Sequence, residues 1–295
     1  MAEQKNLFDF VLNYPIAKNH QLIQILPQFK PIKRGARKKG VERTYVSKDK
    51  KTKATIMMFK ELDIADQDLL LTTLAIALPI KRGYLIEKTD TENGEVVQEL
   101  FKKLELDGVL AQYPSIRIET TYYELLKELN KKITKQNYEW LFDSLKRLSA
   151  TTIMLDTPKF IGSTNLLSFY FDKKTEKLNI AINPINALTL MGDNKGYILN
   201  NRYERLTLKN DTAKALHSVL LTLLNTGQKN IFNLDILIEK VYLKNIEEMN
   251  TNEKKNSRRT IKKALEKINE LQSWEIEIYS NNTVSVHRKY ELLDK

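Results

Sequence analysis

The stretch from residue 256 to residue 288 constrains the fold of this chain more than any other. It begins with a helix pattern whose apolar face consists of Ile261, Leu265, Ile268 and Leu271. Two runs of alternating apolar and polar residues follow, at 274–280 and 283–288, and Asn281 and Asn282 separate them. A helical period that changes to a strand period on both sides of a short turn predicts a helix leading into a β-hairpin. That order is typical of a winged helix, which places the exposed start of its helix in a DNA groove.

An earlier stretch, from residue 120 to residue 183, repeats this plan. Thr121 opens a helix with a capping-box pattern, Asn130 is suited to close it, and Thr134 begins a second helix over 135–149. Strands are expected at 151–155, 166–171 and 178–182. Two such units in one chain predict an α+β fold of two tandem winged-helix domains with a basic N-terminal arm.

The length of 295 residues is enough for two domains, each with its own core. We expect an N-terminal segment at 1–29, a first winged-helix domain with the basic arm at 30–185, and a second winged-helix domain at 186–295. Residues 64–78 form an almost wholly apolar pattern, which predicts a helix buried on all sides.

The second domain is expected to contain two more helices before the basic one. The first is expected to have Asp211 as its N-cap and to close at Gly227, and the second is expected to have Asn233 as its N-cap. Residues 246–256 are polar and predict a turn. The basic helix is therefore expected to begin with Asn256 or Ser257 as its N-cap.

Positive charge is concentrated in one segment of the chain. The formal net charge is +11 and the pI is about 9.4, and residues 30–60 contain 12 Lys and Arg against 2 Asp and Glu. This local balance of +10 leaves a balance of +1 for all other residues. Such a concentration indicates a polyanionic partner, and the alternative is a solvated face or a flexible tail.

The second long helix holds the strongest candidates for DNA contact. Between residues 254 and 263 the chain has six Lys or Arg residues and no acidic residue. Basic side chains at the positive N-terminus of a helix are unfavourable without an external anion, and arginine suits the acceptors of guanine. The residues predicted to contact DNA here are Asn256, Ser257, Arg258, Arg259, Lys262 and Lys263. The alternative is a solvated helix face.

Two further segments are weaker candidates for DNA contact. The first long helix starts with Lys135, Gln136 and Asn137, whose side chains suit phosphate and base contacts, and the alternative is a helix that only packs. The arm carries Lys33, Arg34, Arg37, Lys38 and Lys39. Glycines beside these residues allow a close approach of backbones, so we predict phosphate or minor-groove contacts for the arm.

The chain lacks the residue patterns of the common catalytic and metal sites. It has no cysteine, and its three histidines are isolated in sequence, so it offers neither thiol chemistry nor metal-ligand spacing. The arm resembles the start of a phosphate loop, but Val41 and Glu42 stand where lysine and serine or threonine are required. Asp63, Asp66 and Asp68 fit a helix start better than a metal site. We expect no catalytic residue, no metal and no cofactor.

The sequence also indicates a protein that does not enter a membrane. The first residues contain no uninterrupted apolar segment of the kind that a secretory signal has. The longest apolar run ends at Pro79 and is too short to span a bilayer. We therefore expect a cytoplasmic protein.

Five stretches of the chain, taken in order, resemble the RepC-type replication initiators of IncQ-like plasmids, which are tandem winged-helix plasmid initiators. They are IKRGARKKGVERTYV, the block from Tyr122 to Leu155, LNIAINPINALTLMG, TAKALHSVLLTLL and SRRTIKKALEKINELQSWEIEIY. The resemblance implies a protein that binds directly repeated sites (iterons) at a plasmid origin, helps to open the adjacent AT-rich DNA, and brings in a plasmid-coded helicase and primase. It also implies that the base-reading helices fall on 135–147 and 256–263.

The leading hypothesis is therefore an origin-binding replication initiator without catalytic activity, whose partner is double-stranded DNA and which either acts alone or forms a homodimer. The first alternative is a sequence-specific transcriptional repressor that uses the same two reading helices. The second alternative is an enzyme, such as a primase or a nuclease. Direct repeats in the flanking DNA favour the initiator, whereas a single palindrome at a promoter favours the repressor.

Overall fold

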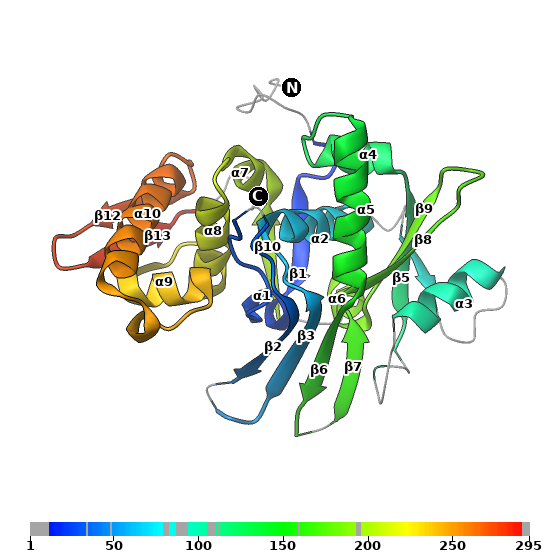
Figure 1. Cartoon of the computed structure of the whole chain (residues 1–295), viewed down its shortest axis with the longest axis horizontal. Helices are drawn as coiled ribbons and strands as arrows, with labels where there is room; N and C mark the ends of the chain where they lie inside the picture. Colours follow the sequence, from blue (N-terminus) through cyan, green and yellow to red (C-terminus); the bar gives the residue numbers. More distant parts are fainter. Residues whose placement is uncertain are drawn as a thin grey trace.

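The computed structural model describes residues 12–290 except for 34, 48, 79–82, 87–93, 105–109, 111–112, 159 and 193–195. Figure 1 shows a larger unit, which contains helices α2 (Ile64–Ala77) and α5 (Lys135–Ser149), beside a smaller unit formed by the C-terminal helices and strands. Each unit has its own buried apolar cluster. The described chain is therefore a mixed α/β protein with two cores.

Two antiparallel sheets form the strand part of the larger unit. The first has the order β2-β3-β6-β7 and the second the order β4-β5-β9-β8. The strands are β2 (Lys39–Val46), β3 (Lys53–Lys60), β4 (Gly83–Ile86), β5 (Ser115–Thr120), β6 (Thr151–Asp156), β7 (Ile161–Asn165), β8 (Leu167–Phe171) and β9 (Leu178–Ile182). Alternation along β3 turns Ala54, Ile56 and Met58 toward the core, while Met57 and Phe59 face outward.

Helix α2 is the central helix of the larger unit. Every residue of α2 except Ala65 is buried, as its apolar sequence predicts. The other helices of this unit are α3 (Gly94–Lys103), α4 (Tyr122–Glu128), α5 and α6 (Pro184–Met191). Helices α4, α5 and α6 contact α2, whereas α3 lies on β8 and β9 of the second sheet.

The smaller unit has the predicted order of helices followed by a hairpin. Its elements are α8 (Asp211–Leu223), β11 (Lys229–Asn233), α9 (Leu234–Tyr242), the 3₁₀ helix η2 (Ile246–Glu248), α10 (Thr251–Asn269), β12 (Trp274–Ile278) and β13 (Thr283–Arg288). The hairpin of β12 and β13 is confirmed at the predicted residues. Strand β11, which the sequence pattern did not predict, pairs with β13 and completes a three-stranded sheet.

A short N-terminal segment connects the two units. Strand β1 (Ile16–His20) pairs with β10 (Tyr197–Asn201), and helices α1 (Gln21–Ile25) and α7 (Arg202–Thr207) follow these strands. Sequence reasoning missed this pairing because both strands are short and lie far apart along the chain. Ile23 of α1 belongs to the core of the larger unit. The division into 1–29, 30–185 and 186–295 stays a proposal.

The predicted ends of α4 and the start of α5 are confirmed. The Thr121 and Thr134 side chains accept hydrogen bonds from the backbone N–H groups of Glu124 and Asn137. Asn130 has a φ of 52°, the left-handed conformation expected of a residue that closes a helix. These caps satisfy backbone groups that would otherwise lack partners at the helix ends.

Helix α10 starts earlier than predicted. It begins at Thr251, where Asn250 and Glu253 form a capping box, so neither Asn256 nor Ser257 is its N-cap. The first turns are polar and show no apolar period, which is why they read as a turn, but the capping box satisfies their N–H groups. The basic residues 254–263 therefore lie in the second to fourth turns, and the argument from an unfavourable helix dipole does not apply to them.

The start of α8 is also shifted. Asn210 is the N-cap and accepts hydrogen bonds from the N–H groups of Thr212 and Ala213, while Asp211 occupies the first turn. Asn and Asp are comparable N-caps, and an acid in the first turn gains from the helix dipole. The helix ends at Leu223, before the predicted end at Gly227.

The strand predicted at 166–171 belongs to a longer path through both sheets of the larger unit. Strands β7 and β8 meet at Leu166, where the chain passes from the first sheet to the second. The hairpin of β6 and β7 joins β3, and the hairpin of β8 and β9 joins β5. Strand β7 escaped prediction because its sequence, IGSTN, lacks a run of β-branched or aromatic residues.

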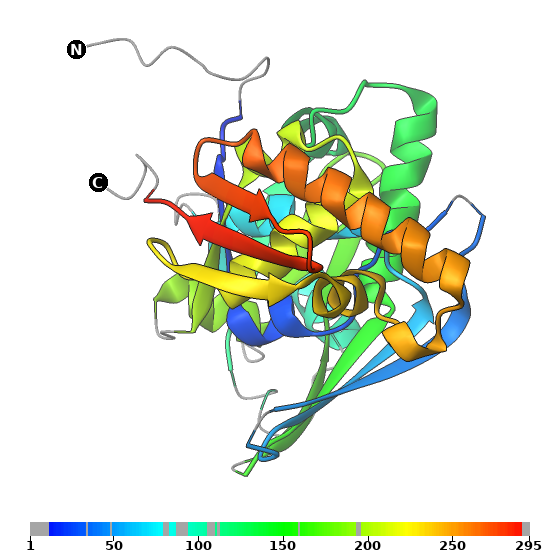
Figure 2. The same ribbon diagram turned by 90° about the vertical axis from the view of Figure 1, so that its left-hand side faces the viewer.

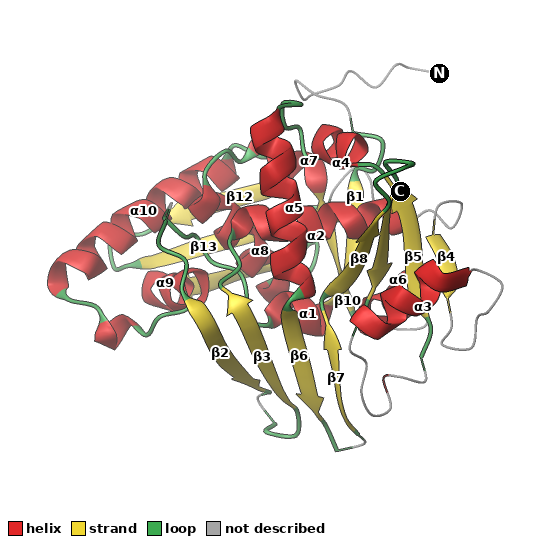
Figure 3. Cartoon of the chain, turned by 45° about the vertical axis from the view of Figure 1, so that its right-hand side comes forward, coloured by secondary structure: helices red, strands yellow, loops and turns green. Residues whose placement is uncertain are grey.

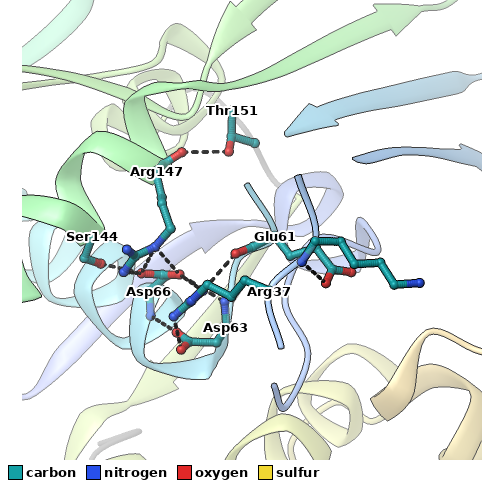
Figure 4. Close-up of polar contacts among 8 residues, drawn as sticks. Arg37, Glu61, Asp63, Asp66, Ser144, Arg147 and Thr151 are labelled. Carbon is teal, nitrogen blue, oxygen red and sulfur yellow. Dashed lines mark hydrogen bonds and ion pairs between the residues drawn. The ribbon is translucent and has the colours of Figure 1, made fainter. Parts of the chain in front are cut away.

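Asp66 of α2 connects the arm to helix α5. Its Oδ2 accepts a hydrogen bond from Arg37 Nη1 at 2.9 Å, and its Oδ1 accepts from Arg147 Nη2 at 2.7 Å and from Ser144 Oγ at 2.6 Å (Figure 4). Burial alone would raise the pKa of Asp66, but Arg147 and Arg37 outweigh it and lower the pKa. Burial and the charge of Asp66 raise the pKa of neighbouring Asp63, which also pairs with Arg37, to about 6.

Asp68, two residues further along α2, connects the larger unit to the smaller one. Its carboxylate accepts from Arg205 Nε of α7 at 2.6 Å and from Lys214 Nζ of α8 at 2.5 Å. A second buried pair acts beside it, because Arg202 of α7 donates to the Glu128 carboxylate of α4 at 2.9 Å. Asp63, the N-cap of α2, forms a capping box with Asp66, as the helix-start interpretation predicted, whereas Asp68 holds ion pairs.

Replacing Asp68 tests this junction. Asp68→Ala leaves Arg205 and Lys214 without their carboxylate, and removing one partner of a buried ion pair typically costs about 3–5 kcal/mol. We expect the free energy of unfolding in urea to fall by about that amount. Asp143→Ala, which removes an exposed acid of α5, serves as the control and should change stability by less than about 0.5 kcal/mol. A loss equal to that of the control would contradict the role of Asp68.

The same carboxylate gives a prediction for pH. Burial alone would raise the pKa of Asp68, but the charges and hydrogen bonds of Arg205 and Lys214 lower it. Its stabilising contribution is therefore complete above the unfolded-state pKa of about 3.9 and is lost as the pH falls through the native pKa. Wild-type stability should fall more steeply below about pH 4 than that of Asp68→Asn, as measured by urea unfolding at a series of pH values. Parallel curves would contradict this assignment.

Candidate nucleic-acid interface

Helix α10 presents its basic residues on the side opposite its buried stripe. Ile261, Leu265 and Ile268 lie in the core of the smaller unit, so the helical period turns the residues between them outward. This outer face lines a groove that reaches the tip of the β12–β13 hairpin. The groove residues are Thr251, Lys254, Lys255, Arg258, Arg259, Lys262, Lys263, Glu266 and Asn282. Six cations against one carboxylate give the groove a positive lining.

Arg258 is held in place within this groove by Asp235 of helix α9. Arg258 Nε donates to Asp235 Oδ1 at 2.7 Å, and Arg258 Nη2 donates to Oδ2 at 2.6 Å. The hydrogen bond from Arg258 lowers the pKa of Asp235, and the same contact raises the pKa of Arg258. Both groups therefore stay charged at neutral pH.

The other predicted residues of α10 differ in what they contact. Arg259 and Lys263 are exposed, and Lys262 is half-buried. Arg259 Nη2 lies 3.4 Å from Asn256 Oδ1, and the half-buried Ser257 hydroxyl lies 4.0 Å from the sulfur of Met249. Within the described ranges, neither Lys262 nor Lys263 has an ion-pair partner.

The start of α5 holds the three candidates of the first reading helix. Lys135 and Gln136 are exposed, whereas Asn137 is half-buried and its Nδ2 donates to the carbonyl of Lys132 at 2.7 Å. Lys135 and Gln136 are therefore the more accessible pair. Further along α5, Arg147 pairs with the buried Asp66 and faces the interior of the unit.

The arm divides into an exposed part and a part fixed to the protein. Lys33, Lys38 and Lys39 are exposed. Arg37 instead donates to the Glu61 carbonyl at 2.8 Å and pairs with Asp63 and Asp66, so its side chain holds the arm against α2. Arg34, the fifth predicted arm residue, lies outside the described residues.

Glu61 fixes the arm at a second point. This buried carboxylate accepts hydrogen bonds from Lys30 Nζ at 2.6 Å, from Arg43 Nη2 at 2.6 Å and from the backbone N–H of Lys38 at 3.1 Å. Burial alone would raise the pKa of Glu61, but Lys30, the backbone of Lys38 and Arg43 outweigh it and lower the pKa. The backbone of the arm is therefore held in place, and its lysines remain exposed.

The three basic elements project to the same side of the molecule. Figure 2 shows the N-terminal half of α10, the arm and helix α5 along one edge, and Figure 3 shows the same arrangement from another direction. The pairing of Arg37 and Arg147 with one carboxylate agrees with the position of the arm beside α5.

Sequence reasoning did not identify two parts of this interface. Asn282 enters the groove because the hairpin folds back along α10, and Asp235 reaches Arg258 from the preceding helix. No single-sequence signal marks either contact, because both depend on how α9, α10 and the hairpin pack. Lys254 and Lys255, which precede the predicted N-cap, lie within α10.

The described residues hold no cluster of three or more His, Cys, Asp or Glu side chains that could bind a metal ion. No helix in the described ranges is long and apolar enough to cross a membrane.

Comparisons with known proteins give a family and a fold. The family model for replication protein C (RepC) matches residues 16–290. A search of curated protein sequences found no significant match.

Solved structures with a similar fold match most of this chain. Selenomethionine crystals of domains 2 and 3 of RctB match with a TM-score of 0.56 at 9% identity, over 89% of this chain and 95% of that one. A second structure of RctB domains 2–3 gives 0.54 at 10% identity, over 92% and 97%. The Pi initiator protein in complex with iteron DNA gives 0.51 at 11% identity, over 94% and 97%. At these identities the comparison shows the fold, which is of the winged-helix type as the sequence pattern predicted.

The different roles of the exposed arm lysines and of Arg37 can be tested by the salt dependence of DNA binding. We expect Lys38→Ala with Lys39→Ala to weaken binding to all duplex sequences alike and to reduce the slope of log affinity against log salt by about one per lost phosphate contact. Arg37→Ala should instead lower the urea midpoint, because it removes a partner of Asp66. Anisotropy titrations of a labelled duplex at several salt concentrations measure the slope. A smaller slope with unchanged stability in Arg37→Ala would show that Arg37 binds phosphate.

Proposed function

The chain belongs to the replication protein C (RepC) family, and we propose that it is a plasmid replication initiator that binds directly repeated sites in origin DNA. The observation that carries the proposal is the placement of two candidate reading helices and a basic arm on one side of a tandem winged-helix fold. A solved structure of this fold, that of the Pi initiator, contains iteron DNA. The partner of this chain is accordingly double-stranded DNA.

Helix α10 reads bases in this proposal, and its basic groove supports that role. The α10 groove contains six cations, of which Arg258 and Arg259 have the planar donors that match guanine in the major groove. Asn256 and Ser257 do not line the groove, so the proposal assigns the base contacts to the two arginines, and the lysines neutralise phosphates. A major groove admits one α-helix, which suits the exposed face of α10.

Helix α5 is the second reading helix of the proposal. Lys135 and Gln136 are exposed at its start, and Asn137 lies beside them. The charge of this helix start is lower than that of α10, so we assign it fewer phosphate contacts. The exposed arm lysines contact the backbone between the two readers.

Two different readers on one chain allow a monomer to cover an asymmetric repeat. Major-groove segments one turn apart are separated by about 34–36 Å, a distance within reach of two linked units. The buried pairs of Asp68 and Glu128 hold these units together. A symmetric dimer is therefore not required for binding one repeat.

Opening of the origin and recruitment of a helicase and a primase are the finer parts of the proposal. They are supported by membership of a replication protein family. The acidic residues of α2 are engaged in ion pairs that hold the fold, so we assign this chain the role of a DNA-binding initiator and leave catalysis to its partners.

Footprinting tests the two-reader arrangement. We expect a monomer to protect about two turns of DNA. Gln136→Ala with Asn137→Ala should remove protection from one half of the repeat. Arg259→Ala should remove protection from the other half and weaken specific binding by roughly 1–3 kcal/mol.

Two variants control for general effects. Lys267→Ala removes a cation from α10 outside the groove, and Asp143→Ala changes an exposed residue of α5, and neither should alter the footprint. Loss of protection in the same half by both reader variants would contradict the two-reader model. A palindromic footprint that needs two chains would favour a repressor.

A further inference from the structure

Asp235 of α9 is hydrogen-bonded to one residue of the α10 groove in the described part of the chain, Arg258. It lies in the first turn of α9 and is not among the groove residues, while Arg258 is. The two side chains form a bidentate pair, at 2.7 Å and 2.6 Å, and are about one quarter and one third exposed. Asp235 therefore lies behind Arg258, and Arg258 itself lines the groove.

The geometry of the pair leaves one edge of Arg258 unoccupied by Asp235. A guanidinium group has five N–H donors in a fixed plane. Asp235 takes the Nε donor and one donor of Nη2. The second donor of Nη2 and one donor of Nη1 form the end of the plane as two parallel N–H groups, while the other donor of Nη1 points back along the side chain. That end matches the O6 and N7 acceptors of guanine.

Asp235 is itself fixed to the hairpin that borders the groove. Its backbone N–H donates to the Oδ1 of Asn233, the N-cap of α9, at 2.8 Å. The next residue of the cap, Leu234, donates its N–H to the carbonyl of Asn282 at 2.9 Å. The start of α9, which carries Asp235, is therefore attached to the tip of the hairpin, and Asn282 of that tip lines the groove.

We propose that Asp235 is a positioning residue for base recognition, which orients the free end of Arg258 toward a guanine in the major groove. The inference rests on the proposed function and deepens it by naming the base and the residue that determines how it is read. An arginine held in advance loses less conformational freedom on binding than a free one. The opposite role is a brake, in which Asp235 competes with DNA for Arg258.

The test starts by finding the site. The full-length chain is used to enrich binding sequences from a random duplex library, and the wild type, Asp235→Ala, Asp235→Glu and Arg258→Ala are then compared on the enriched site and its single-base variants. We expect Asp235→Ala to reduce the preference for guanine at one position by roughly 5- to 160-fold, the range that corresponds to one bidentate contact. Asp235→Glu should recover part of this preference.

A double variant shows whether Asp235 acts through Arg258. If it does, adding Asp235→Ala to Arg258→Ala changes base preference no further. Glu270→Ala removes a negative charge from the C-terminal end of α10. It controls for the gain in DNA affinity that any lost negative charge would cause. Urea unfolding of each variant shows that the fold is intact, and the salt slope should not change because no phosphate contact is lost.

The outcomes separate this inference from the proposed function. Tighter binding of Asp235→Ala with unchanged base preference would identify a brake and overturn the positioning role. Unchanged affinity and preference would overturn it as well. Failure of the wild type to enrich any sequence would instead defeat the proposed function itself.

Discussion

Buried ion pairs at the start of helix α2 are the interactions on which the arrangement of this protein depends. Asp66 binds Arg37 of the arm and Arg147 of α5, and Asp68, on the next part of the helix, binds Arg205 and Lys214. Because an uncompensated buried charge is costly, each carboxylate requires its partners in place. These ion pairs attach the arm, the first candidate reading helix and the smaller unit to one helix, α2.

This arrangement explains how a chain with two separate cores can present one basic surface. Helix α7 contributes Arg202 and Arg205 to the junction, and both side chains are almost fully buried. Such pairs fix geometry more than they add stability, because desolvation offsets much of the attraction. The proposed DNA site of two helical turns requires fixed geometry, since a reading helix displaced from its groove would lose its base contacts.

Some arginines of the chain hold the fold and others line the basic groove, and the residues next to them in sequence do not show which is which. Arg37 lies in the densest basic run, yet it pairs with carboxylates of α2, while Lys38 and Lys39 beside it are exposed. Arg258 lies in the groove of α10 and is held by Asp235 on one edge. The deciding factor in each case is a carboxylate supplied by a segment distant in sequence.

The sequence by itself determined the local structure: helix α5 with its Thr134 cap, the largely apolar α2, the β12–β13 hairpin and the basic face of α10 follow from period, caps and turn residues. These features depend on residues within a few positions of each other. Tertiary structure alone decided the pairing of β1 with β10, the union of β2 and β3 with β6, and the partners of Arg37 and Arg258. Those contacts join segments far apart in the chain, and their energy depends on burial and on the geometry of opposite charges, which a local pattern does not record.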